Sequence, residues 1–133
     1  MAAPVPVRGL LLGKNPAHLQ ACIDTAAPDC EFVRKASSVD DAKKALSALL
    51  NGKEIQFVAM GGGFTMADFE ELHQGNAASI PWYRPETTKP GYDGPPMTGP
   101  PSPETVASKL RKGLDEHVED MKAGKGAGEV WYF

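Results

Sequence analysis

The stretch from Ile55 to Thr65, which reads IQFVAMGGGFT, decides the fold. An almost continuous apolar run stops at three glycines and is followed by a threonine, a residue suited to capping a helix. Side chains alternate between the two faces of a strand. Here both faces are apolar, with Ile55, Phe57 and Ala59 on one and Val58 and Met60 on the other. Such strands form the buried centre of parallel sheets. We therefore predict a central strand that delivers a glycine turn to the N-terminus of a helix.

Strands and helices are predicted to alternate on both sides of this segment. Short apolar runs mark the strands, and helix-starting residues follow them, as in the pair Asn15-Pro16. In chain order, the predicted strands cover 5–13, 30–35, 55–60 and 79–83, and the predicted helices begin at Pro16, after Ser37 or Ser38, after Thr65 and at Pro103. This alternation is typical of an α/β domain.

Two local features refine these predictions. Asp68 follows Thr65 at the spacing of a capping box, and the helix that they begin is predicted to turn three side chains inward: Met66, Phe69 and Leu72. Pro81 has no N–H for a sheet ladder, so the strand over 79–83 is predicted to be short or to lie at an edge of the sheet.

Short connections between alternating strands and helices predict parallel pairing through right-handed crossovers. We predict a three-layer open parallel sheet of four or five strands in the order 2-1-3-4(-5). This architecture resembles the flavodoxin-like, Rossmann-like and receiver-like folds, and the resemblance implies the fold alone. A receiver carries acidic residues after its first strand and an aspartate at the end of its third. Here Lys14-Asn15 and Met60-Gly61 stand at those places, which excludes phosphoacceptor chemistry.

The length of 133 residues predicts one domain with two special segments. The proline- and glycine-rich segment 84–103 is either an ordered lid or a disordered loop. The tail 123–133 ends in EVWYF, which forms a fifth strand, packs on its own sheet or inserts into a second subunit. If the last helix joins the second and third helices, one sheet face stays bare, and a bare apolar face predicts a homodimer.

Composition and motifs exclude several classes of function. The net charge of -3 provides no basic surface for nucleic acid. No apolar window is long enough for a membrane span, so we expect a cytoplasmic protein. Cys22 and Cys30 are predicted to be buried thiols rather than a disulfide or a reactive pair. No metal-binding motif occurs, and the glycine turn matches neither the dinucleotide fingerprint nor the P-loop, so we expect no metal and no cofactor.

The candidate site lies where the strand order reverses, because ligands of open parallel sheets bind outside the carboxyl ends of the strands at that point. The candidate ligand-binding residues are Lys14, Asn15, Gly61, Gly62, Gly63, Thr65 and Arg84, and the candidate proton carriers are His18 and Tyr83. Backbone N–H groups of the glycine turn would hold an anion. Two plainer interpretations stay open: the glycines form only a tight turn, and His18 is an ordinary exposed residue.

Two classes of function follow from these patterns. The first is a small-molecule-binding protein, in its catalytic form a cofactor-independent enzyme, that acts on a small anionic or carbonyl-bearing ligand at the C-terminal edge of the sheet. The alternative is a non-catalytic module for oligomerisation or protein interaction that uses a bare sheet face and the aromatic tail. No substrate or reaction type is predicted.

Overall fold

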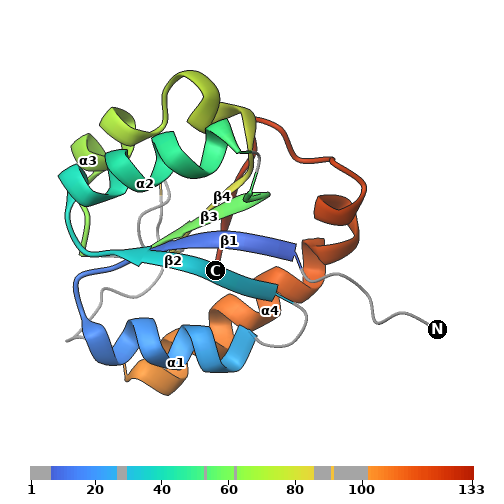
Figure 1. Cartoon of the computed structure of the whole chain (residues 1–133). Helices are drawn as coiled ribbons and strands as arrows, with labels where there is room; N and C mark the ends of the chain where they lie inside the picture. Colours follow the sequence, from blue (N-terminus) through green and yellow to red (C-terminus); the bar gives the residue numbers. More distant parts are fainter. Residues whose placement is uncertain (1–6, 27–29, 53, 62, 86–90, 92–101) are drawn as a thin grey trace.

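The computed structural model describes residues 7–26, 30–52, 54–61, 63–85, 91 and 102–133 of the chain. A five-stranded sheet lies between two layers of helices (Figure 1). The strands are β1 (Val7–Leu12), β2 (Cys30–Ala36), β3 (Phe57–Met60), β4 (Trp82–Arg84) and β5 (Val130–Tyr132). The helices are α1 (Pro16–Ala26), α2 (Val39–Asn51), α3 (Met66–Leu72), the short 3-10 helix η1 (Gly75–Ser79) and α4 (Pro103–Lys122). Residues 86–90 and 92–101 of the predicted lid or loop lie outside the described residues.

All strand pairs are parallel, and the strand order is β2-β1-β3-β4-β5. The predicted three-layer parallel fold and its strand order are therefore confirmed. The central position of β3 agrees with its composition, because all four of its residues are buried. None of the helices in the described part of the chain is long and apolar enough to cross a membrane.

Polar side chains begin the helices at the predicted places. The Ser38 side chain accepts a hydrogen bond from the N–H of Asp41 at the start of α2. At the start of α4, the Ser102 side chain likewise accepts a hydrogen bond from the N–H of Thr105. Such caps satisfy backbone donors that have no partner within the helix. Each helix therefore starts immediately after its cap, which sets where it lies along the sheet.

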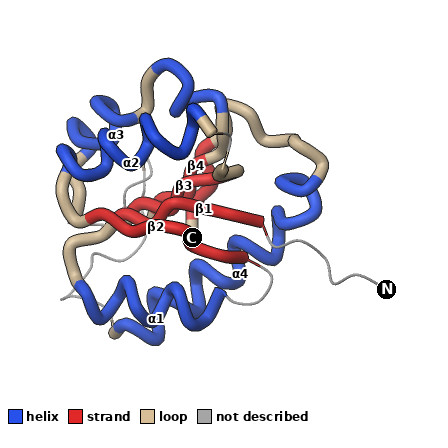
Figure 2. Tube along the Cα trace, in the orientation of Figure 1, coloured by secondary structure: helices blue, strands red, loops and turns tan. Residues whose placement is uncertain are grey.

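The helices form one layer on each face of the sheet (Figures 1 and 2). Helices α2 and α3 lie on one face, whereas α4 lies beside α1 on the other. Arg111 of α4 donates hydrogen bonds of 2.9 and 3.1 Å to the carbonyl oxygens of Thr25 and Ala26 at the end of α1. A bare sheet face is expected only if α4 joins α2 and α3. Because α4 lies beside α1 instead, that condition is not met.

The core consists of two apolar clusters, one on each side of the sheet. Phe57 and Ala59 face α1 and α4, and Val58 and Met60 face α2 and α3, as the alternation predicts. The prediction for Ile55 is wrong: it packs with Val58 on the α2 side. The reason is that Ile55 precedes β3 and Gln56 forms a bend, so strand alternation has not yet begun.

The prediction for Met66 is wrong, and the prediction for the strand at Pro81 is confirmed in one of its two alternatives. Met66 is 40% exposed, because α3 turns this residue toward solvent near its N-terminus, whereas Leu72 is buried. Strand β4 is short, as Pro81 indicated, but it is not an edge strand. It pairs with β3 on one side and with β5 on the other. The C-terminal segment thus forms a fifth strand of its own sheet.

The outermost strand β2 contains an irregularity. Gly9 pairs with Phe32 and Leu10 pairs with Arg34, so Val33 has no partner in β1. Val33 is also 38% exposed, which is unusual for a large apolar residue. An extra residue of this kind bends the strand and increases its twist.

Candidate functional site

The C-terminal ends of β1, β3 and β4 meet at one edge of the sheet, and Phe64 lies where cations from two of these ends converge. The Lys14 Nζ atom, just after β1, lies 5.1 Å from the centre of the Phe64 ring. The Arg84 Nη2 atom, at the end of β4, donates a 3.4 Å hydrogen bond to the Phe64 carbonyl oxygen. Lys14 and Arg84 thus both contact Phe64, one through its ring and the other through its carbonyl oxygen.

Arg84 is a buried cation. Its exposed fraction is 1%, and its guanidinium carbon lies 4.9 Å from the centre of the Phe69 ring. The Nη1 atom contacts the Met66 sulfur at 3.9 Å, while Nε is buried and has no hydrogen-bond partner in the part of the chain that the structure describes. Burial lowers the pKa of Arg84, because desolvation disfavours the charged form. No carboxylate of the described residues forms an ion pair with this side chain.

Lys14 is exposed and sits against the glycine turn. A Cβ atom added at Gly63 would lie 3.3 Å from the Lys14 Cβ, so the missing side chain of Gly63 makes room for the lysine stem. Neither Gly61 nor Gly63 has a φ in the left-handed region. Close approach of another residue therefore explains Gly63 better than the demands of the turn itself.

The backbone donors of the glycine turn are largely used within the protein. The N–H of Gly61 donates to the Leu12 carbonyl oxygen at 2.8 Å, and the N–H of Phe64 points to the Gly61 carbonyl oxygen at 3.5 Å. The N–H of Thr65 donates to the Asp68 Oδ2 atom at 2.9 Å. Gly62 lies outside the described residues. Side-chain cations, rather than the N–H groups of this turn, are thus the main positive groups of the site.

Thr65 and Asp68 form a complete capping box. The Thr65 Oγ1 atom accepts a 3.1 Å hydrogen bond from the Asp68 N–H, which complements the bond in the opposite direction. The backbone bond from Thr65 lowers the pKa of the Asp68 carboxyl, and the nearby charges of Lys14 and Arg84 add to this effect. Asp68 is therefore a fixed, ionised group beside the two cations.

Asn15 and His18 lie at the start of α1. The Asn15 Oδ1 atom accepts hydrogen bonds from the N–H groups of Ala17 at 3.0 Å and His18 at 3.3 Å. The carbonyl oxygen of the Asn15 side chain thus caps the helix. His18 is half-buried in the first turn of α1, on the helix layer opposite α3.

Tyr83 lies on the other side of the sheet from the Arg84 side chain. It is fully buried in the cluster under α1 and α4, and its hydroxyl donates a 3.0 Å hydrogen bond to the Gly113 carbonyl oxygen. Burial raises the pKa of Tyr83, because the phenolate would be desolvated. The sequence placed Tyr83 and Arg84 together, but neighbours in a strand point to opposite faces.

Sequence reasoning missed three residues of this site. Asp68 was recognised only as a cap, and Phe69 only as an inward-facing residue. Tyr132 pairs with Arg84 in the register of β4 and β5, and it lies close enough to raise the pKa of Arg84. The sequence indicates that the C-terminal segment is a possible fifth strand. Aligning that strand in parallel with β4 is the step that would place Tyr132 beside Arg84.

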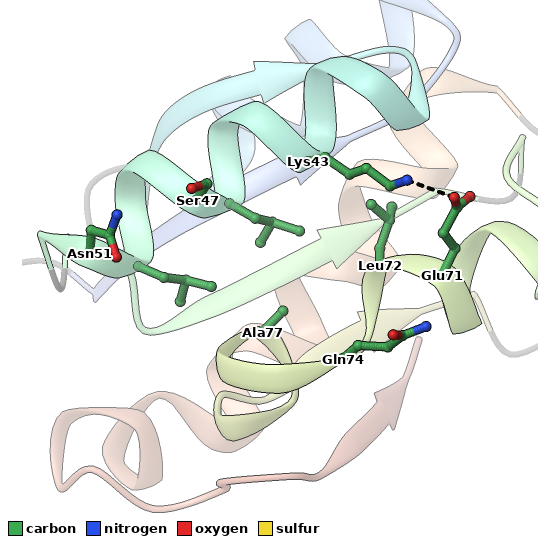
Figure 3. A pocket seen from close by; sticks show the side chains of 9 residues that line it. Lys43, Ser47, Asn51, Glu71, Leu72, Gln74 and Ala77 are labelled. Atoms are coloured by element: carbon green, nitrogen blue, oxygen red, sulfur yellow. Dashed lines mark hydrogen bonds and ion pairs between the residues drawn. The ribbon is translucent and has the colours of Figure 1, made fainter.

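A separate hollow of about 250 Å³ lies between α2 and the α3–η1 segment (Figure 3). Leu46, Leu50, Leu72 and Ala77 form its apolar part. An exposed ion pair of 2.6 Å joins Lys43 and Glu71 across it. The hollow is open to solvent, and its two charged side chains, Lys43 and Glu71, are already paired with each other. We therefore place the candidate site at Arg84 instead.

The described residues contain no group of three His, Cys, Asp or Glu side chains that could hold a metal ion. The thiols Cys22 and Cys30 are buried and unbonded to each other, as predicted, and burial raises the pKa of Cys22 to about 11. Comparisons with protein-family models, curated proteins and solved structures found no match to this chain.

Proposed function

We propose that this protein binds a small anionic molecule at the C-terminal edge of its sheet, where Lys14 and Arg84 supply the attracting charge. One observation carries the proposal: the Arg84 side chain is 1% exposed, and its Nε atom has no hydrogen-bond partner among the described residues. A charged group removed from water costs several kcal/mol unless an opposite charge or hydrogen bonds compensate it. A bound anion would supply that compensation.

The chemistry of the two cations supports a carboxylate or a similar oxyanion. A guanidinium is planar and presents its donors in a fork that matches two oxygens at once. The Phe69 ring beside the Arg84 guanidinium holds that plane in a defined orientation. Lys14 is exposed and flexible, so it serves as a point charge that adapts to the ligand.

The proposal concerns binding, and catalysis stays a prediction. Tyr83 is left out of the proposed site, because its hydroxyl already donates to Gly113 on the opposite face of the sheet. A proton-transfer role for His18 is retained from the sequence. The homodimer stays a prediction, but its stated basis, a bare sheet face, is removed because α4 packs beside α1. We also retain the cytoplasmic location and the flavodoxin-like likeness as predictions. The strand order supports the last of these.

Thermal unfolding in the presence of sodium acetate tests the proposal, with sodium chloride at the same ionic strength as the reference. A ligand that binds only the folded state raises the melting temperature. We expect acetate to stabilise the wild type, and we expect this effect to shrink in Lys14→Met and in Arg84→Lys, which keeps the charge but loses the fork.

Arg8→Met is the matched control. Arg8 is exposed near the amino end of β1, and its 3.8 Å ion pair with Glu31 lies at the surface. This variant loses a positive charge without touching the proposed site, so it should respond to acetate as the wild type does. Equal acetate responses in the wild type, Lys14→Met and Arg84→Lys would remove the proposal.

A further inference from the structure

Asp68 places a negative charge among the two cations of the proposed site. Its Oδ2 atom is held at 2.9 Å from the Thr65 nitrogen. Arg84 contacts the residues on both sides of Thr65, through the Phe64 carbonyl oxygen and the Met66 sulfur. Asp68 therefore shares one short segment of chain with the groups that the Arg84 guanidinium touches.

This carboxylate does not neutralise either cation directly. Within the described residues, Asp68 forms no ion pair with Lys14 or Arg84, and its hydrogen bonds go to Thr65. Lys14 and Arg84 nevertheless lie close enough for their charges to lower the pKa of the Asp68 carboxyl, so the three charges interact through space. The capping box fixes its position, so the effect does not depend on a mobile side chain.

We infer that Asp68 restricts the proposed site to singly charged carboxylates and disfavours phosphate and other doubly charged anions. The inference rests on the proposed function, because it specifies which anion that site accepts. Lys14, Arg84 and Asp68 together leave one net positive charge, which a single carboxylate balances. A phosphate group carries about −1.5 to −2 charges near pH 7, so it exceeds that balance.

Arg84 cannot make this distinction by itself. The guanidinium fork pairs with two oxygens of a carboxylate or of a phosphate equally well in geometry. Repulsion from Asp68 grows with the charge of the ligand, whereas the number of oxygens facing the fork stays the same. Asp68 is thus a specificity-determining residue, and it need not touch the ligand.

The unpartnered Nε of Arg84 offers a direct measurement. In a nitrogen–proton correlation spectrum, the Arg84 Nε–H signal is assigned by its loss in Arg84→Lys. It is then followed in separate titrations with sodium acetate and with inorganic phosphate at constant ionic strength. We expect the wild type to bind acetate more tightly than phosphate.

Asp68→Asn keeps an oxygen that can accept from the Thr65 N–H but removes the charge. We expect it to strengthen acetate binding about two- to fivefold and phosphate binding by about the square of that factor, because repulsion scales with ligand charge. Glu70→Gln is the control, since Glu70 is exposed on the same helix and loses the same charge. It should leave the acetate-to-phosphate preference unchanged.

Lys14→Met tests the same charge balance without altering the cap, in case Asp68→Asn disturbs α3. Loss of one positive charge should weaken phosphate more than acetate. If neither anion moves the Arg84 signal in any variant, the anion site and the proposed function both fall. If both anions bind but phosphate is preferred by the wild type, or Asp68→Asn leaves the preference unchanged, the role of Asp68 is overturned while anion binding stands.

Discussion

At the residue scale, Phe69 joins the proposed anion site to a half-buried histidine, His73. The Arg84 guanidinium lies 4.9 Å from the centre of the Phe69 ring, and the His73 ring stacks on Phe69 at a centroid distance of 4.8 Å. Trp82 meets the His73 ring edge-on at 5.4 Å. The Nε2 atom of His73 is buried and has no hydrogen-bond partner in the described structure. These contacts suit a neutral imidazole.

His73 is expected to make stability fall at mildly acidic pH. Desolvation lowers its pKa in the folded protein below the ordinary value of 6.5, so the unfolded chain takes up the proton first as pH falls. The contribution of His73 to the free energy of unfolding is therefore fully present above about pH 7. It declines as the pH falls from 6.5 through the pKa that His73 has in the folded protein. The effect is expected to stay below about 1 kcal/mol, because the side chain is only half-buried.

Urea unfolding at pH 8 and pH 5.5 measures this dependence. His73→Phe retains an aromatic ring against Phe69 but has no proton to gain, so the variant should lose less stability between the two pH values than the wild type. At pH 8 the comparison reports only the change in packing. Identical pH dependence in both proteins would show that His73 does not titrate differently on folding.

At the element scale, the centre of the sheet depends on a glycine that faces an aromatic ring. A Cβ atom added at Gly9 in β1 would lie 2.3 Å from the Phe57 Cζ atom, and Phe57 is fully buried in β3. The Phe57 ring is also held edge-on by Phe32 and by Tyr83. These contacts and its full burial limit how far the Phe57 ring can move to make room.

Gly9→Ala is expected to lower the free energy of unfolding by about 1–3 kcal/mol, the range for overpacked cores. Gly52→Ala is the matched control, because the added Cβ would meet only the flexible Glu54 side chain and the φ of −84° suits alanine. The control should change stability by less than about 0.5 kcal/mol. A wild-type urea midpoint for Gly9→Ala would contradict this view of the sheet centre.

The elements themselves were largely predictable, because apolar runs, capping residues and short connections are local signals. The side chosen by α4 was not predictable, since an apolar stripe fits either face of a sheet equally well. The burial of Arg84 could not be predicted from the sequence either. Arginine is normally exposed, and the Phe64 and Phe69 contacts come from residues far from it in sequence. Register between strands, which brings Tyr132 beside Arg84, needs the folded sheet. The separation of Tyr83 from Arg84, by contrast, follows from alternation within one strand.

At the scale of the whole molecule, the C-terminal strand β5 is the last strand of the sheet and packs against α4. The Trp131 ring stacks on the His117 ring at 3.8 Å and meets Tyr83 edge-on at 5.4 Å. The N–H of Phe133 donates to the Arg84 carbonyl oxygen at 3.0 Å. The tail thus binds its own domain and covers the outer side of β4.

Trp131→Ala should lower the free energy of unfolding by about 2–4 kcal/mol, because a large aromatic contact is lost at a half-buried position. The mass in solution, measured by sedimentation, should match that of the wild type, since these contacts lie within one chain. A drop in mass together with wild-type urea stability would instead indicate that the tail acts between subunits.

The bulge at Val33 has a consequence for how copies of the chain meet. Arg34 and Lys35 follow it on the same outer strand, and both are exposed. A buckled strand that carries adjacent positive charges is a poor template for further backbone pairing, so one molecule cannot readily extend the sheet of another through β2. Concentrated solutions are therefore protected from fibrous growth along β2, even though no described strand pairs with its outer side.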